Sequence, residues 1–300
     1  MPALNVRLLC LLSTLALLGA GQVSALYCLP PITPDPIKLA DVASVTLKRT
    51  RASGITINTQ NIYQNGLLRS VNRQDIFTLP ALPGTTKGRQ NISTAAETLH
   101  YTPAGRLAQI DIVSEGSDGA DHTQKQYEYD VQGQLVRVLY KAEPRSAWAT
   151  LATCTFSAGT VTEHETEILG FKPRTTVYAL DARGQVMSYS VTLRGDEQDT
   201  NVTTITRDER GAVTHTEQRV ISTISPLDVT STTYNGAGLP AQTVTNIYGN
   251  DSELEYTGTT TFEYVMDARG NWTSASEYSS SGGVRELQGT ETRTITYTRP

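Results

Sequence analysis

The 300-residue chain is 38% hydrophobic and 18% charged, which suits a folded core and excludes an intrinsically disordered chain. Its formal net charge of -5 argues against nucleic-acid binding, because binding to phosphates needs a basic face. The 44 threonines and 14 tyrosines, against 4 phenylalanines, favour β-structure, since both residue types suit a pleated, half-hydrated surface.

The N-terminus has the layout of a secretory signal peptide. Arg7 precedes an apolar run from Leu8 to Leu18, and small residues lead to a cleavage site after Ala25. The run is too short for a comfortable membrane span, and no later segment is apolar enough for a transmembrane helix. We therefore expect residues 1–25 to be a signal peptide and the mature protein to be secreted, periplasmic or in the cell envelope. A retained N-terminal anchor is the alternative.

Two cysteines remain once the expected signal peptide is removed. Cys28 and Cys154 can pair, because exported proteins mature under oxidising conditions. Two free or buried thiols are the alternative. A bridge would close a loop of more than a hundred residues, for which the chain-entropy model gives about 4–5 kcal/mol of stabilisation.

Residues 26–59 are predicted to form a proline-rich lead followed by a β-hairpin. The lead covers residues 29–36. A strand is predicted over residues 42–50, with a turn at 52–54 and a partner strand that starts at Ile55.

A short motif, D-x-x-G, recurs through residues 60–300, which we predict to form one repeat domain. The spacing between successive glycines is about 26 residues, and a bulky apolar residue usually follows two positions after each glycine. Turn-forming residues also occur midway between the glycines, so each period holds two turns and two strands. The strict copies are Asp130 with Gly133, Asp181 with Gly184, Asp208 with Gly211, and Asp267 with Gly270; looser copies end at Gly66, Gly105, Gly159 and Gly238.

The residue types of this motif indicate one kind of turn. The side chain of Asp, Asn or Thr accepts a hydrogen bond from the backbone two residues further on. The glycine supplies the left-handed conformation that closes a type I turn with a G1 bulge. The sequence therefore predicts an all-β protein, a long antiparallel meander of about eight β-hairpin units with up to sixteen strands. Such a sheet must twist and curl, and the sequence leaves open whether it forms a half-shell, two layers or a barrel-like structure.

The pattern Y-x-Y-D-x-x-G-x-L at residues 127–135 resembles the YD repeat of the RHS family, and residues 262–272 are similar to a variant of it. The resemblance covers most of residues 60–300. It implies a β-sheet shell or an extended surface structure, here as a short, secreted protein without a toxin domain. It supplies no catalytic residues. Three units depart from the pattern where Tyr is usual, at Leu180, Arg207 and Met266.

No motif in the sequence nominates a catalytic residue. The four histidines form neither H-x-x-x-H nor H-E-x-x-H, and there is no G-x-S-x-G elbow or phosphate-binding loop. His164 and Glu165 are adjacent, so the strand period places them on opposite faces. We expect a protein that is not an enzyme. An exported hydrolase with a carboxylate pair is an alternative, because such a pair needs only the right separation in space.

Acidic residues gather in three of the turns midway between the glycines. Carboxylates on loops can bind Ca²⁺, and solvated turn charge is the alternative. No other cofactor is indicated. The weak calcium candidates are Glu115, Asp118, Asp121, Asp196, Glu197, Asp199, Asp251, Glu253 and Glu255.

Together these features predict a secreted or cell-envelope protein that binds or scaffolds. Its partner would be an envelope polysaccharide or a protein, and exposed edge strands would favour self-association. An outer-membrane β-barrel is the other alternative, since the strands have a suitable length. Against it, the strand after Gly211 shows no face that could contact lipid. One face is expected to carry Val213, His215, Glu217 and Arg219, and the other Thr214, Thr216 and Gln218.

Overall fold

The computed structural model describes residues 27–29, 41–78, 90–116, 119–142, 147–167, 173–193, 200–221, 227–249, 253–281 and 284–298. These residues form 18 antiparallel strands. Among them, no helix is long and apolar enough to cross a membrane. The strands are β1 (Val42–Arg51), β2 (Ile55–Gln64), β3 (Leu67–Thr78), β4 (Gln90–Tyr101), β5 (Leu107–Gly116), β6 (Gly119–Tyr129), β7 (Leu135–Ala142), β8 (Ala149–Ser157), β9 (Thr160–Glu165), β10 (Arg174–Leu180), β11 (Val186–Leu193), β12 (Thr200–Arg207), β13 (Val213–Ile221), β14 (Leu227–Tyr234), β15 (Pro240–Tyr248), β16 (Leu254–Met266), β17 (Trp272–Ser281) and β18 (Val284–Tyr297).

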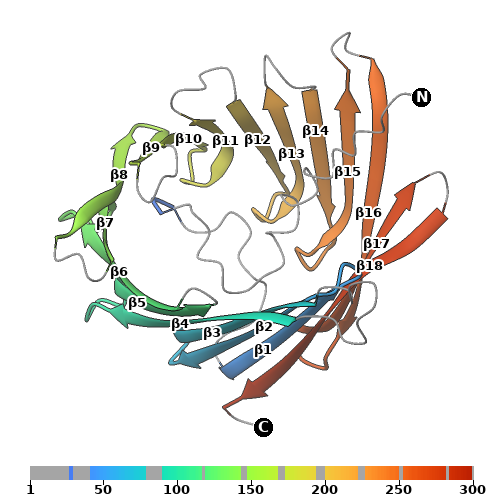
Figure 1. The fold of residues 1–300 in the computed structure, drawn as a ribbon. Coiled ribbons are helices and arrows are strands. Elements are labelled where there is room, and N and C mark those ends of the chain that lie inside the picture. Colours follow the sequence, from blue (N-terminus) through green and yellow to red (C-terminus); the bar gives the residue numbers. More distant parts are fainter. Residues whose placement is uncertain are drawn as a thin grey trace, which may run out of the picture.

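The strands form one closed barrel. Each strand pairs with the next along the chain, and β1 also pairs with β18, so the sheet has no free edge among these strands (Figure 1). The predicted all-β hairpin meander is confirmed, and of the shapes that the sequence left open the structure has the barrel. Glycine turns join the strand pairs from β2–β3 to β16–β17. The two strands outside these pairs, β1 and β18, close the ring. A strand at the position of β1 was predicted separately from the repeat, whereas β18 was not predicted.

The D-x-x-G turns have the hydrogen bonds expected from their residue types. In the turn between β10 and β11, the Asp181 carboxylate accepts from the backbone N–H groups of Arg183 and Gln185, both at 2.8 Å. The Gly184 N–H donates to the Asp181 carbonyl at 3.0 Å, with Gly184 in the left-handed region at φ 76°. The same bonds recur around Asp208, Asn235 and Asp267.

Substitution of Gly133 by Val is expected to lower the free energy of unfolding by about 1–2 kcal/mol, because Gly133 has φ 83° and a side chain in the left-handed region is strained. A Cβ atom there would also displace the Arg106 guanidinium, which lies 1.9 Å from the ideal position. Urea denaturation of this variant and of Gln132→Val, an exposed change in the same turn, measures the difference. Equal midpoints for the two variants would contradict the turn assignment.

Each D-x-x-G turn also reverses the alternation of faces on the strand that follows. The pairing shifts register after the turn, as where Arg207 pairs with Val213 after Thr206 pairs with His215. Val213 is therefore turned to the same side as Arg207 and is 8% exposed, whereas His215 faces the opposite side. The expectation that Val213 shares a face with His215, Glu217 and Arg219 is wrong, because the bulge inserts an extra residue between them.

The tyrosine before the turn links one hairpin to the preceding one. The Tyr101 hydroxyl donates to the Leu68 carbonyl at 2.6 Å, and the Tyr129 hydroxyl donates to the Leu107 carbonyl at 2.8 Å. Each carbonyl belongs to the residue two positions after the previous turn glycine. Where Arg207 replaces the tyrosine, its guanidinium donates to the Val186 carbonyl, the equivalent acceptor, at 3.5 Å.

The disulfide identifies the inward face of the barrel. Residues 27–29 lie inside the ring of strands (Figure 1), and Cys28 is bonded to Cys154 on β8. Directly paired residues on antiparallel neighbours project from the same face. The inward face can therefore be followed by register from Cys154 to Glu163, then to Thr176, and onward around the ring.

The buried strand side chains lie on this inward face in two hydrophobic clusters. The larger contains the disulfide, and the smaller lies where β1, β17 and β18 meet. Both form because neighbouring inward side chains crowd together on the concave side of the sheet. The larger includes Val71, Leu99, Ile110, Tyr127, Val138, Ala152, Val161, Tyr178 and Ile205, and the smaller includes Val45, Leu47, Trp272 and Ala275.

Candidate functional site

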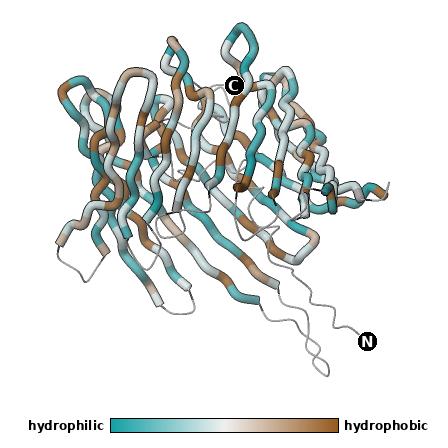
Figure 2. The backbone as a smooth tube through the Cα atoms, turned by 90° about the horizontal axis from the view of Figure 1, so that it is seen from above, coloured by the Kyte–Doolittle hydropathy of each residue, from teal (hydrophilic) through white to brown (hydrophobic). Residues whose placement is uncertain are grey.

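The outward face of the barrel is rich in hydroxyl and amide side chains. On β18, inward and outward residues alternate, with Glu291, Arg293 and Ile295 inward and threonines at the positions between them. In Figure 2, hydrophilic and hydrophobic residues alternate along the strands. Outward polar residues on β1, β2, β11, β12, β14 and β18 include Ser44, Thr46, Asn58, Gln60, Ser188, Ser190, Thr192, Thr204, Ser231, Thr290, Thr292 and Thr294.

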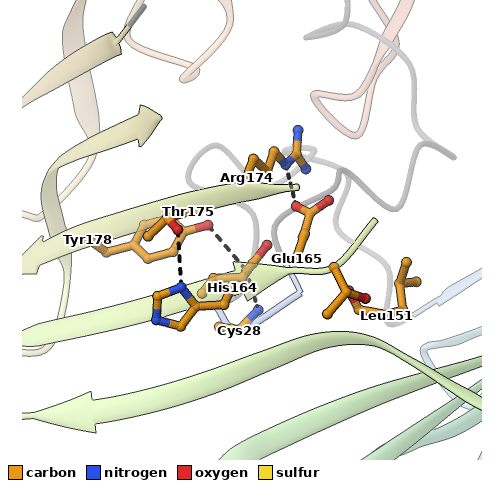
Figure 3. A network of polar contacts seen from close by, with 9 residues as sticks. Cys28, Leu151, His164, Glu165, Arg174, Thr175 and Tyr178 are labelled. Carbon is orange, nitrogen blue, oxygen red and sulfur yellow. Dashed lines mark hydrogen bonds and ion pairs between the residues drawn. The ribbon is translucent and has the colours of Figure 1, made fainter. Parts of the chain in front are cut away.

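A group of polar side chains surrounds Cys28 on the inward face, which we call the Glu163 cluster (Cys28, Glu163, Glu165, Arg174 and Tyr178; Figure 3). Glu163 is fully buried. Its Oε2 accepts a hydrogen bond from the Cys28 N–H at 3.0 Å and one from the Tyr178 hydroxyl at 3.4 Å. The neighbouring inward residue on β9, Glu165, forms an ion pair with Arg174.

Burial, together with the nearby Glu165 carboxylate, raises the pKa of Glu163 to about 7, while the Cys28 N–H and Arg174 oppose the shift. When protonated, Glu163 can donate to Glu165. Burial and the two carboxylates also raise the pKa of Tyr27 to about 12. Glu163 therefore holds its proton up to about pH 7, and the Cys28 N–H binds its carboxyl group. These contacts tie residues 27–29 to the wall.

The disulfide between Cys28 and Cys154 is the pairing that the sequence left open. Outside the barrel, His164 lies on the opposite face from Glu165, as the strand period predicts. Its Nδ1 lies 3.1 Å from the Thr175 hydroxyl. His164 is therefore a solvent-facing residue rather than part of the Glu163 cluster.

A second group of charged residues lines a cavity on the inward face of β1, β16, β17 and β18. The cavity, which we call the Arg49 pocket, has a volume of about 10 Å³, enough for about one water molecule, and opens to solvent. Glu291 accepts two hydrogen bonds from Arg49, at 3.0 and 2.7 Å, so both side chains are fixed. Beside it, the Arg293 guanidinium lies 3.5 Å from the centre of the Trp272 ring. The residues that line the cavity are Arg49, Arg51, Phe262, Ala275, Ser276, Glu277, Gly289, Thr290 and Glu291.

Sequence reasoning named Cys28 as a disulfide candidate and Glu165 beside His164, but it predicted neither of these two groups. The one sequence signal of these residues is that charged side chains share a strand face with buried apolar side chains, as in TETRTI at residues 290–295. The partner of Glu291 lies 242 residues away, because β18 returns to β1 only when the barrel closes. No pattern along the chain could therefore have joined these residues.

The acidic turn residues are only partly within the described chain. Glu115, Asp121, Glu253 and Glu255 are exposed. Throughout the described ranges, no three or more His, Cys, Asp or Glu side chains are grouped so that they could hold a metal ion. The calcium sites stay a prediction; Asp118, Asp196, Glu197, Asp199 and Asp251, like the signal peptide at residues 1–25, lie outside the described residues.

Comparison with known proteins does not assign the chain to a family. No family model matches, and no curated protein matches. Among solved structures, the chain is similar to a porin-like protein from Bacteroides uniformis, with 15% identity and a TM-score of 0.45, covering 88% of this chain and 100% of that one.

The chain is also similar to parts of Tc toxin chains. The match to TcdB2-TccC3-TEV has 11% identity and a TM-score of 0.29, and it covers 80% of this chain. The match to the Photorhabdus luminescens Tc holotoxin pore has 12% identity, a TM-score of 0.20 and 73% coverage of this chain. The chain spans only 16% and 15% of the length of those two toxin chains. The relationship to the RHS family therefore stays a resemblance.

Proposed function

We propose that this chain is an exported, non-enzymatic binding or scaffolding protein of the cell envelope, and that its barrel wall stands in water. The observation that carries the proposal is the polarity of the outward face, which carries mainly hydroxyl, amide and charged side chains, while the buried apolar side chains of the strands lie on the inward face. A barrel in lipid needs the opposite arrangement, an apolar outer band around a polar interior. Its partner would be an envelope polysaccharide or a protein.

Ion pairs on the outward face support the same proposal. Glu128 pairs with Arg137 at 2.6 Å, and Glu217 pairs with Arg219 at 2.8 Å. All four side chains are between 31% and 55% exposed. Arg or Lys on a lipid-facing strand costs about 2–4 kcal/mol at the bilayer midplane, so these positions suit an aqueous surface.

An outer-membrane barrel is a second candidate, and the closure of the 18-stranded sheet favours it. In a bilayer every backbone polar group must be paired, and a closed barrel satisfies this condition. Closure alone does not require lipid, because it also removes the free edges that would lead a sheet in water to aggregate. The outward threonines contact water if the barrel stands in water, and they contact lipid if it is an outer-membrane barrel.

Labelling of introduced cysteines distinguishes these candidates. Thr292→Cys places a thiol on the exposed outward face of β18, and Ala275→Cys places one at a buried inward position. The native pair Cys28 and Cys154 is oxidised and does not react. In an intact envelope preparation, a membrane-impermeant maleimide is expected to modify Thr292→Cys but not Ala275→Cys. Protection of Thr292→Cys until detergent is added would favour the outer-membrane barrel.

The binding role is tested by incubating the purified protein with the cell-envelope fraction of its source, with and without EDTA. We expect the protein to be retained. Release by EDTA would support calcium at the acidic turns, whereas unchanged retention would argue for solvated turn charge. No retention would contradict the proposed binding role.

A further inference from the structure

The junction between β18 and β1 has the backbone hydrogen bond of a repeat turn, although no turn joins these two strands. In the turn between β4 and β5, the Thr102 N–H donates to the Arg106 carbonyl, four residues further on, at 2.7 Å. At the junction, the Thr298 N–H donates to the Asp41 carbonyl at 2.8 Å, and Asp41 lies 257 residues away in the chain. The same N–H bond occurs at 2.8 or 2.9 Å in the turns that begin at Asp130, Asp181, Asp208, Asn235 and Asp267.

The strand register at the junction is also that of a repeat hairpin. In the hairpin of β4 and β5, Tyr101 pairs with Leu107, and the bulge then skips one residue of β5. At the junction, Tyr297 pairs with Val42, and the pairing skips Ala43 in the same way. Val42 therefore occupies the position of the bulky apolar residue that follows each turn glycine, and like most of those residues it is buried.

The tyrosine at the junction has the surroundings of a tyrosine before a repeat turn. The Arg69 guanidinium, from the preceding hairpin, lies 5.0 Å from the centre of the Tyr101 ring. In the same way Arg269, from the turn between β16 and β17, lies 4.0 Å from the centre of the Tyr297 ring. The Tyr297 hydroxyl differs in its acceptor, since it donates to the Asp267 carboxylate at 2.6 Å in place of a backbone carbonyl.

We infer that β18 and β1 together form a ninth copy of the repeat hairpin, split between two distant parts of the chain, and that the barrel wall opens first at this junction, which we call the seam. Every other pair of neighbouring described strands is consecutive in the chain, so a turn or loop joins it (Figure 1). A short connection keeps two strands close when their pairing opens, because closing a short loop costs little entropy. The seam lacks this tether.

Inward side chains across the seam take the place of the missing turn. Arg49 on β1 and Glu291 on β18 are directly paired, and their two hydrogen bonds measure 3.0 and 2.7 Å. Both side chains are buried, at 14% and 6% exposed. Beside them, Val45 pairs directly with Ile295 within the smaller hydrophobic cluster. The ion pair is therefore the latch of the seam, since removing one partner of a buried ion pair is strongly destabilising.

Hydrogen exchange of the purified full chain, measured by mass spectrometry, tests the inference. Residues 293–297 report on the seam, because they pair only with β1, and residues 99–101, which pair only with β5, are the internal reference. In the latch variant Glu291→Gln we expect exchange in residues 293–297 to rise about tenfold or more, with little change in residues 99–101. Glu165→Gln is the matched control, because it breaks a direct inward ion pair with Arg174 in strands that a loop still joins. Exchange in β9 and β10 should rise far less.

A cross-link can supply the tether that the seam lacks. Ser44 and Thr296 are directly paired on the outward face, so Ser44→Cys with Thr296→Cys, once oxidised, joins β1 to β18. This bridge should slow exchange in residues 293–297 of the otherwise unmodified protein, and it should reverse the effect of the latch variant. The control is Ala179→Cys with Ser188→Cys, at the equivalent positions of the continuous hairpin of β10 and β11, and it should do neither.

Two results would overturn the inference. Exchange could rise equally in both segments of the latch variant, which would mean a general loosening of the barrel, or the seam cross-link could leave exchange in residues 293–297 unchanged. If the latch variant does not fold, the cross-link in the otherwise unmodified protein decides. The inference does not depend on the proposed binding role.

Discussion

Replacement of both Cys28 and Cys154 by Ala is expected to lower the free energy of unfolding by about 4–5 kcal/mol. The bridge joins residues 126 positions apart, so removing it restores a large amount of conformational entropy to the unfolded chain. This is a large share of the stability of an ordinary domain, which is about 5–15 kcal/mol. The loss is measured by urea denaturation of the double variant and of the unmodified protein.

The single variant Cys154→Ala is the matched control, because it removes the same bridge while leaving Cys28 in place. It should be destabilised about as much as the double variant, and a thiol reductant should bring the unmodified protein to the same denaturation midpoint. A loss below about 1 kcal/mol in both variants would show that the bridge contributes little to stability.

The Glu163→Gln variant is expected to lose a pH dependence that the unmodified protein shows between about pH 4.5 and 7. Glu163 ionises near its ordinary value of 4.5 when unfolded but only at about 7 when folded. Between these values the folded state holds the extra proton, so stability falls as pH rises through this window and levels off above it. The difference of about 2.5 pKa units corresponds to about 3 kcal/mol.

Gln has the shape of the protonated Glu, and its carbonyl oxygen can still accept from the Cys28 N–H and the Tyr178 hydroxyl. The variant should therefore match the unmodified protein near pH 4.5 and be more stable above pH 7. Denaturation curves at pH 4.5, 6 and 8 measure this. Glu128→Gln, on the outward face, is the control and should leave the pH dependence in place. Parallel curves for Glu163→Gln and the unmodified protein would mean that Glu163 is already ionised when folded.

Much of the fold follows from short-range patterns that the sequence displays. Asp181 and Gly184 form the predicted turn because a side-chain acceptor and a residue tolerant of positive φ are both local requirements. The period of about 26 residues then counts the hairpins, and the alternation within strands gives the antiparallel meander. The separation of His164 from Glu165 follows from the same period of two.

The closure of the barrel and both polar groups on its inward face were decided by tertiary structure. A hairpin motif specifies its own two strands, but whether β18 meets β1 depends on twist and stagger summed over the whole ring. The strand pairing also decides which side chains point inward. The bulge after each turn reverses the alternation of inward and outward side chains, and it turns Val213 inward. Arg49 and Glu291 lie 242 residues apart in the chain and become partners only when the last strand pairs with the first. The repeating unit could be predicted from residue types because its hydrogen bonds are local, whereas the barrel interior depends on contacts between strands far apart in the chain.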